Sequence, residues 1–270
     1  MLNFENKSKY DVYDLQRLIK LLRSPAGCPW DRVQTHESIR RNFLEETYEA
    51  VEAIDEGDPR HLCEELGDVL TQVIFHADLE EDAGRFDLDD VADMCVRKLI
   101  SRHPHVFGDG SVTSTGQVLD NWDAIKRVEK DQKTVTDAVN AVARTLPGLW
   151  RAEKIQNKTA KAGFDWPETA QSLQKLREEL EELEAAQKDG GDPREELGDL
   201  LFAAVNVSRH LGMDPDAVLQ EACDKFARRF GETERQVLAQ GKTPEQMSAQ
   251  ELLAIWNHVK KANPQNSAFG

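Results

Sequence analysis

The sequence EELGD occurs twice in this chain, at residues 64–68 and again at residues 195–199. Each copy follows a turn rich in Gly, Asp and Pro, and each opens a run of apolar residues with the spacing of a helix. Ahead of each turn lies a further pair of glutamates separated by two residues, at positions 46 and 49 and at positions 179 and 182. The chain therefore contains two copies of a carboxylate-bearing helical hairpin.

Further matched features extend the repeat over most of the chain. The pairs Gly27/Trp30, Lys98/Arg102 and Trp122/Lys126 correspond, in the same order, to Gly163/Trp166, Lys225/Arg229 and Trp256/Lys260. A shared order of this kind is typical of an internal duplication. We expect two tandem domains, residues 1–132 and residues 133–270, with the segment from about residue 131 to residue 147 linking the copies.

Helical periodicity dominates the sequence, and alternating strand patterns are nearly absent. The apolar spacing, bounded by Gly and Pro breakers, predicts helices over residues 11–23, 37–56, 60–82, 88–101, 117–130, 148–160, 168–188, 194–211, 215–238 and 248–261. The sequence therefore predicts an all-α fold.

The charge, the apolar runs and the cysteines exclude several classes of binding partner and location. The formal net charge of −16 repels polyanions, so we expect no nucleic-acid binding, although cations could still neutralise a small phosphorylated ligand. The apolar runs at residues 69–77 and 200–207 are too short to span a bilayer, and the polar start resembles no signal peptide. The four cysteines show no zinc spacing, which predicts free, mostly buried thiols and a cytoplasmic location.

Each copy brings two acidic pairs onto neighbouring helices. Residues three apart share one helical face, and the short turn makes the two helices antiparallel neighbours. Converging carboxylates repel one another, and a divalent cation relieves the repulsion. Ligands that are all oxygen favour Mg²⁺, with Mn²⁺ also plausible. The expected metal ligands are Glu179, Glu182, Glu196 and Asp199, with Glu46, Glu49, Glu65 and Asp68 as the equivalent first-copy set.

The second copy is the better candidate for chemistry. Apolar residues occupy nearly the whole circumference of its second carboxylate helix, among them Leu197, Leu201 and Phe202. We therefore expect that helix to be largely buried. One strip of it stays polar, through Glu196, Asp199, Ala203, Asn206 and His210. The corresponding first-copy strip, Glu65, Asp68, Gln72, Phe75 and Leu79, turns apolar halfway along. Whether the first copy is active stays open.

A triphosphate would also need cations for its remaining oxygens. Lys225 and Arg229 are four residues apart and share a helical face, as do Trp256 and Lys260. Arg is well suited to bidentate phosphate contacts. We expect these four residues to bind substrate, with Trp256 either stacking on a base or anchoring its helix in the core.

These motifs resemble those of the MazG-type nucleoside triphosphate pyrophosphohydrolases in their two-domain form. The resemblance covers nearly the whole chain and rests on the repeated E-x-x-E … E-x-x-D spacing. Supporting motifs are GCPWD at residues 27–31, RHPHVF at 102–107, GFDW at 163–166 and KFARRF at 225–230. One difference is the short turn between the second copy's carboxylate helices, residues 189–193.

The resemblance implies helices packed as four-helix bundles, formed across a homodimer. It also implies Mg²⁺-dependent cleavage of an NTP or dNTP to the monophosphate and pyrophosphate. Cleavage between the α and β phosphates follows from the resemblance alone. In the resulting hypothesis, Glu179 and Glu196 are catalytic as well as metal-binding, and Lys225, Arg229 and Lys260 stabilise charge on the phosphates.

Two other classes of protein fit the same residues. One is a non-catalytic regulatory module that binds metal or nucleotide without turnover. The other is a structural dimeric scaffold whose carboxylates are solvated and whose melting temperature does not respond to Mg²⁺. The base preference, the sugar preference and the cellular role are open.

Overall fold

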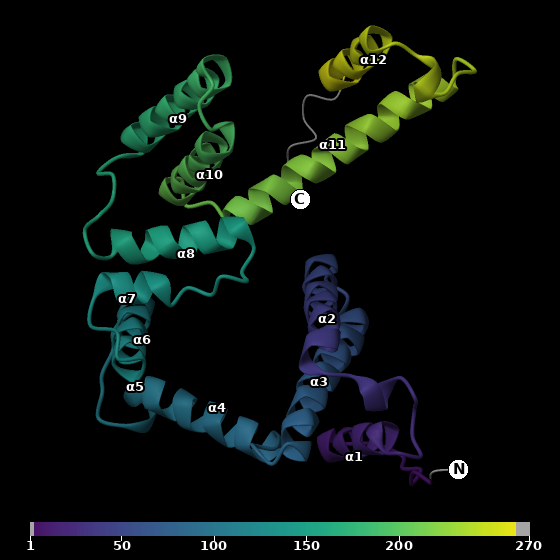
Figure 1. The fold of residues 1–270 in the computed structure, drawn as a ribbon, viewed down its shortest axis with the longest axis vertical. Helices are drawn as coiled ribbons and strands as arrows, with labels where there is room; N and C mark the ends of the chain where they lie inside the picture. Colours follow the sequence, from purple (N-terminus) through teal and green to yellow (C-terminus); the bar gives the residue numbers. More distant parts are fainter. Residues whose placement is uncertain (1–2, 263–270) are drawn as a thin grey trace. The chain divides into compact units, whose positions relative to one another are not determined.

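The computed structural model describes residues 3–262, apart from the side chains of Asp120 and Asp189. The chain divides into two compact units, Met1–Ile125 and Lys126–Gly270. Every regular element among the described residues is helical, which confirms the predicted all-α fold (Figure 1). The ends of the two predicted domains, residues 1–2 and 263–270, lie outside the described residues.

Unit 1 is built around a hairpin of two helices, α2 (His36–Glu56) and α3 (Pro59–Asp82). The turn between them depends on Gly57, whose φ of +69° lies in the left-handed region that favours glycine. The helix α1 (Val12–Arg23) packs against α3. The remaining elements are η1 (Asp31–Val33), α4 (Leu88–Arg102), α5 (Pro104–Phe107) and α6 (Thr115–Glu129), which crosses the boundary between the units.

The core of unit 1 lies where α1, α2 and α3 meet, and it consists of Ile19, Ile39, Ile74 and Phe75. Arg23 of α1 covers one edge of this core. Its guanidinium carbon lies 5.3 Å from the centroid of the Phe75 ring. The same side chain forms ion pairs with Asp78 and Asp82 of α3, the second at 2.7 Å. Apolar burial and these ion pairs together fix α1 on α3.

A chain of polar contacts also joins α2 to α3. The Nδ1 atoms of His36 and His76 lie 2.7 Å apart, and Nε2 of His36 lies 2.6 Å from Oε1 of Glu80. With both rings neutral, His76 donates to His36 and His36 donates to Glu80. Hydrogen bonds from Arg85 and then His36 lower the pKa of Glu80 to about 2. Burial, together with the neighbouring His36, lowers the pKa of His76.

Unit 2 repeats the hairpin with α9 (Thr169–Asp189) and α10 (Pro193–His210), the pair with the most extensive helix–helix contact. Gly190 ends α9 with a φ of +79°. The helix α8 (Gly148–Ala160) packs against α10, and α11 (Pro215–Leu238) packs against α8 and α12 (Ala249–Ala262). The short elements α7 (Val135–Asn140) and η2 (Pro244–Gln246) complete the unit.

Both hairpins start their second helix in the same way. Asp58 and Asp192 are N-caps whose carboxylates accept hydrogen bonds from the backbone N–H two residues on, at 2.8 and 2.9 Å. A proline follows each cap at the first helical position, where its missing N–H costs nothing. The repeated D-P signal therefore sets where α3 and α10 begin.

Two short α-helices among the described residues lie outside the helices that the sequence predicts. The first, α5, begins at Pro104, and the second, α7, lies in the predicted linker. A reciprocal capping box between Thr134 and Asp137 starts α7, and such a local device needs no long apolar period. The structure divides the chain after Ile125, within α6, whereas the internal repeat predicts a boundary after residue 132.

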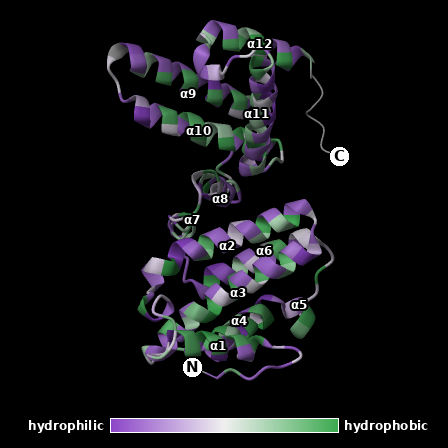
Figure 2. Cartoon of the chain, turned by 90° about the vertical axis from the view of Figure 1, so that its right-hand side faces the viewer, coloured by the Kyte–Doolittle hydropathy of each residue, from purple (hydrophilic) through white to green (hydrophobic). Residues whose placement is uncertain are grey.

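Two burial predictions are wrong. The helix α10 is only partly buried, because Leu197, Leu201 and Phe202 are 47%, 53% and 42% exposed. Its neighbours α8 and α9 cover only part of its circumference, so apolar residues remain on the outer surface of the hairpin (Figure 2). Three of the four thiols, those of Cys63, Cys95 and Cys223, are exposed rather than buried. No described helix combines the length and apolarity needed to cross a membrane.

Candidate functional site

The hairpin of unit 2 brings three of the four predicted metal ligands together. Glu179 of α9 and Glu196 and Asp199 of α10 each place one carboxylate oxygen within 4.8 Å of the others. Glu182 is not part of this group, although its negative charge acts on Glu196. The i, i+3 spacing on α10 and the tight turn at Gly190 produce this convergence.

The carboxylates of this cluster differ in environment. Partial burial and then the charge of Glu182, followed by other acidic neighbours, raise the pKa of Glu196. Glu179 is 7% exposed, and its carboxylate lies 2.8 Å from Nζ of Lys175, one turn earlier on α9. The hydrogen bond to Glu179 raises the pKa of Lys175. The buried carboxylate therefore already has a cationic partner.

A cavity of about 390 Å³ adjoins the cluster. Its walls come from α8, α9, α10 and the loop between α8 and α9. The lining residues are Ile155, Gln156, Thr159, Gly163, Phe164, Asp165, Trp166, Ser172, Lys175, Glu179, Asp199, Phe202, Ala203, Asn206 and Arg209. Its size lies within the range of small-molecule sites, roughly 300–1,000 Å³. The carboxylates at one wall suit a cation, or an anionic group that brings a cation with it, and the aromatic side chains at another wall suit a ring.

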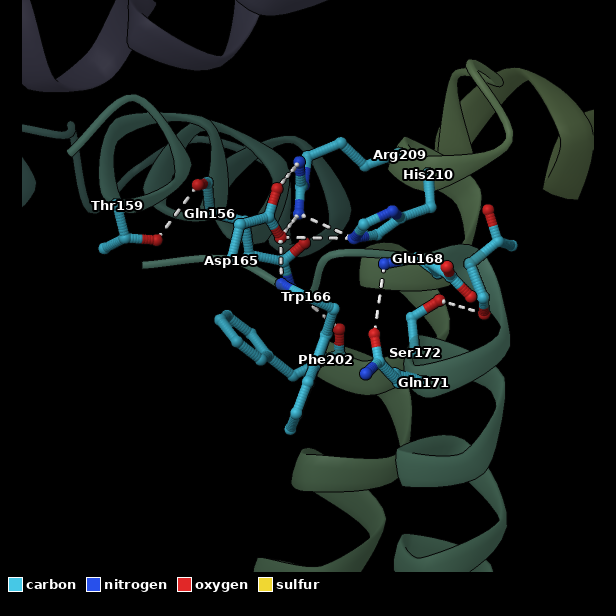
Figure 3. Close-up of polar contacts among 11 residues, drawn as sticks. Gln156, Thr159, Asp165, Trp166, Glu168, Gln171, Ser172, Phe202, Arg209 and His210 are labelled. Atoms are coloured by element: carbon cyan, nitrogen blue, oxygen red, sulfur yellow. Dashed lines mark hydrogen bonds and ion pairs between the residues drawn. The ribbon is translucent and has the colours of Figure 1, made fainter. Parts of the chain in front are cut away.

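A polar network fixes the loop side of the cavity (Figure 3). Asp165 receives hydrogen bonds from the guanidinium of Arg209, one of them at 2.8 Å, and lies 3.1 Å from Nε2 of His210. The hydrogen bonds from Arg209 are the main cause of the lowered pKa of Asp165. Trp166, which follows Asp165, is held beside the end of α10 by this network.

Of the predicted polar strip on α10, Asp199, Ala203 and Asn206 line the cavity. The predicted substrate-binding residues lie elsewhere in unit 2 and do not contribute to the lining. Lys225 and Arg229 are on α11, and Trp256 and Lys260 are on α12. The Trp256 ring centroid lies 5.0 Å from that of Phe226, so this tryptophan joins α12 to α11.

Unit 1 contains a similar acidic group, but the side chain at the position of Asn206 is different. Glu46, Glu49 and Glu65 place carboxylate oxygens within 4.8 Å of one another, and Asp68 is not part of this group. Burial and then the charge of Asp68 raise the pKa of Glu46. The position that corresponds to Asn206 is occupied by Phe75, which is buried in the core. The two copies therefore share the acidic groups and differ in the residue two turns further along the second helix, which is Phe75 in unit 1 and Asn206 in unit 2.

Several lining residues are not among those that the sequence predicts for the site, notably Gln156, Lys175 and Arg209. Lys175 precedes Glu179 by one helical turn, and that spacing was a usable signal. Gln156 lies on α8, outside the repeated motifs, and reaches the cavity only through the packing of α8 on α10. Nothing in the sequence around Arg209 indicates a role at the cavity. Only the structure does so, because it places Arg209 beside Asp165.

Comparison with known proteins gives the family. The MazG nucleotide pyrophosphohydrolase domain matches residues 34–107 and 168–232, so each match includes one carboxylate hairpin. The nucleoside triphosphate pyrophosphohydrolase of Escherichia coli (strain K12) is 43% identical over 252 residues, which cover 92% of this chain and 96% of that protein.

Two further relatives span most of this chain. The nucleoside triphosphate pyrophosphohydrolase/pyrophosphatase MazG of Thermotoga maritima is 42% identical over 247 residues, covering 92% of this chain and 94% of that protein. Uncharacterized protein YabN of Bacillus subtilis is 41% identical over 263 residues, covering 95% of this chain and 53% of that protein. With both domain matches on the two hairpins, the chain belongs to the MazG nucleotide pyrophosphohydrolase family.

Proposed function

We propose that this chain hydrolyses nucleoside triphosphates, or their deoxy forms, to the monophosphate and pyrophosphate, and that it does so in unit 2. One observation carries the proposal: Glu179 and Asp199 belong both to the carboxylate cluster and to the wall of the cavity. A cluster suited to a cation therefore adjoins a space suited to a small organic molecule. The names of the Escherichia coli and Thermotoga maritima relatives support this reaction class.

The donor set fits a hard divalent cation. Glu179, Glu196 and Asp199 offer oxygen atoms only, the ligands that hard divalent cations prefer. We assign these three residues and Glu182 as ligands of Mg²⁺, with Mn²⁺ as an alternative. When bound, the cation supplies positive charge that offsets the triphosphate, and it makes a water molecule more acidic.

The remaining chemistry belongs to the chain's own side chains. Glu196 belongs to the carboxylate cluster, and we assign it to accept a proton from the attacking water. Glu179 is buried and orients that water while Lys175 balances its charge. We assign Glu179 and Glu196 as the catalytic pair, acting on a water in line with the pyrophosphate leaving group.

Cations on α11 and α12 are proposed to bind the phosphates. Lys225 and Arg229 lie one turn apart on α11, and Lys260 lies on α12. The planar guanidinium of Arg229 can hold two phosphate oxygens at once. The contact between Trp256 and Phe226 supports an anchoring role for Trp256, which keeps α12 and Lys260 in position.

We further propose that the protein is a homodimer. Unit 2 exposes Leu180, Leu197 and Leu201 on its hairpin, and unit 1 exposes Leu44, Tyr48, Val51, Ile54 and Leu66 on the corresponding helices. Apolar patches on helical hairpins are usually covered, and two hairpins that meet face to face form a four-helix bundle. A twofold dimer would cover the same surface on both copies.

The experiment is to incubate the full chain with each common NTP and dNTP, with and without Mg²⁺, and to identify products by phosphorus NMR. Monophosphate and pyrophosphate, formed only with metal, are the expected products. Diphosphate and phosphate would contradict the cleavage position. Absence of turnover, combined with a Mg²⁺-dependent rise in melting temperature, would identify a non-catalytic metal-binding module instead.

A further inference from the structure

The loop between α8 and α9 is joined to the end of α10 by an ion pair. Both carboxylate oxygens of Asp165 accept hydrogen bonds from the terminal nitrogens of Arg209, one of them at 2.8 Å (Figure 3). The Arg209 side chain is 14% exposed and that of Asp165 is 25% exposed, so the contact is largely shielded from water. Paired contacts of this kind fix the orientation of both groups as well as their separation.

This loop forms one wall of the cavity, although its own side chains are poorly packed. Phe164 and Trp166 line the cavity and are 82% and 42% exposed. Gly163, which precedes them, has a φ of +86°, a backbone conformation that favours glycine. Because exposed side chains contribute little apolar burial, the position of the loop depends mainly on the ion pair between Asp165 and Arg209.

Unit 1 has the opposite charge at the same helix position. The internal repeat aligns Arg209 of α10 with Asp78 of α3, and it aligns Asp165 with Pro29, so unit 1 lacks both partners of this contact. Asp78 pairs instead with Arg23 of α1. The ion pair of unit 1 therefore joins the first helix to the hairpin, whereas that of unit 2 joins the loop to the hairpin.

Three positions that line the cavity of unit 2 are core positions in unit 1. The aligned pairs are Ile155 and Ile19, Ser172 and Ile39, and Asn206 and Phe75. The members in unit 1 are 3%, 2% and 6% exposed. Arg23, which aligns with Thr159 of the cavity wall, covers the Phe75 ring at 5.3 Å from its centroid. An ion pair to the first helix thus accompanies closed packing, and an ion pair to the loop accompanies an open cavity.

We propose that Asp165 and Arg209 are positioning residues whose ion pair holds the loop as a wall of the cavity, so that substrate enters a preformed site. The inference rests on the proposed function, in which the carboxylate cluster beside this cavity carries the reaction. The ion pair itself is not part of that cluster. Without it, substrate must order the loop on binding, which weakens capture and leaves the carboxylates in place.

The test removes each partner separately in the full chain and measures kcat and KM for ATP with Mg²⁺. Asp165→Asn and Arg209→Gln should each raise KM by about tenfold and change kcat by less than about threefold, because only binding is weakened. Circular dichroism checks the fold, and a folded variant on either side of the ion pair decides the question. A KM within about twofold of wild type would overturn the inference, and so would a loss confined to kcat.

Conservative and matched variants separate positioning from a general loss of structure. Asp165→Glu keeps a carboxylate for Arg209, so its KM should lie closer to wild type than that of Asp165→Asn. Arg235→Gln is one control, because Arg235 pairs with Glu232 on the surface of α11 and does not line the cavity. Asp78→Asn is the second control, since it breaks the aligned ion pair of unit 1 and should lower the melting temperature without changing KM.

The outcomes for this inference and for the proposed function are distinct. An equal rise in KM in Asp78→Asn and in Arg209→Gln would overturn the positioning role, because it would show a general effect of lost stability. No turnover of ATP by the wild-type chain would instead refute the proposed function.

Discussion

Glu196 and Asp199 lie one helical turn apart on α10, and each differs from a neutral isostere by a single charged oxygen. We predict that Glu196→Gln or Asp199→Asn lowers kcat by a factor on the order of 10²–10³, because each removes charge from the cation site and adds almost no change in shape. Steady-state rates and circular dichroism together test this prediction. Near-wild-type rates in both variants would refute the site assignment.

The first-copy residues provide matched variants. Glu65→Gln and Asp68→Asn make the same chemical change on α3, where Phe75 fills the neighbouring position. If unit 2 carries the reaction, these variants retain turnover. A loss equal to that of the unit 2 variants would show that both copies contribute.

Lys175 allows a second prediction at this scale. Lys175→Met leaves the buried Glu179 carboxylate without its partner at 2.8 Å, so we expect the metal-free protein to lose roughly 1–3 kcal/mol of stability. Because Mg²⁺ no longer competes with an ammonium group, the rise in melting temperature on adding Mg²⁺ should be larger than in wild type. Thermal melts with and without Mg²⁺ measure both effects. A smaller rise would contradict the proposed competition.

Single residues also show what could be predicted from the sequence. Glu179, Glu196 and Asp199 converge as expected, because helical spacing alone places acidic pairs on one face. Glu182 is not part of the closest group, since side-chain rotamers decide which of two suitable glutamates points inward. Gln156 could not be found, because only the packing of α8 on α10 brings it to the cavity.

At the scale of elements, local sequence signals explain most of the agreement between the predicted and the observed helices. The helices α3 and α10 begin at Asp–Pro caps, and α2 and α9 end at glycines with positive φ. Such signals act within a few residues and can be read directly from the sequence. The exposure of α10 could not be read in this way, because an apolar circumference does not say whether its partner belongs to the same chain.

The contact between α2 and α3 carries a pH prediction. Burial lowers the pKa of His76 from 6.5, so the folded chain binds fewer protons than the unfolded chain once the pH falls through 6.5. Stability from the histidine pair is therefore complete above that pH and is lost below it. Two charged rings would also repel each other across the 2.7 Å contact. We expect the melting temperature of wild type to fall between about pH 8 and about pH 5.

The variant His76→Asn and the pH range of Glu80 show which group causes the fall in melting temperature. His76→Asn keeps a donor near the position of Nδ1 and removes the titration, so its melting temperature should depend less on pH over that range. Glu80 acts in another window: its pKa is lowered from 4.5 to about 2, so its contribution is complete above 4.5 and is lost as the pH falls toward 2. An equally steep fall in His76→Asn would exclude the histidine pair as the cause.

At the scale of the whole molecule, the exposed apolar residues predict that folding depends on association. If two copies cover these surfaces, the melting temperature rises with protein concentration, because dimerisation stabilises only the folded state. Sedimentation should give twice the mass of 30.5 kDa. Leu201→Glu places a charge on a half-exposed surface of α10 and should shift the protein toward monomer. A concentration-independent melt at the mass of one chain would contradict the dimer.

The closed core beside the acidic group of unit 1 has an evolutionary consequence. After a duplication, one copy can keep the ligand contacts while the other is free to exchange them for packing. Phe75, which lies under Arg23 in the core where unit 2 has Asn206, fits such an exchange. Selection on substrate would then constrain position 206 strongly and position 75 only by volume. Across many relatives, substitutions at 75 should follow those of other core residues, while substitutions at 206 should follow those of the other side chains that line the cavity.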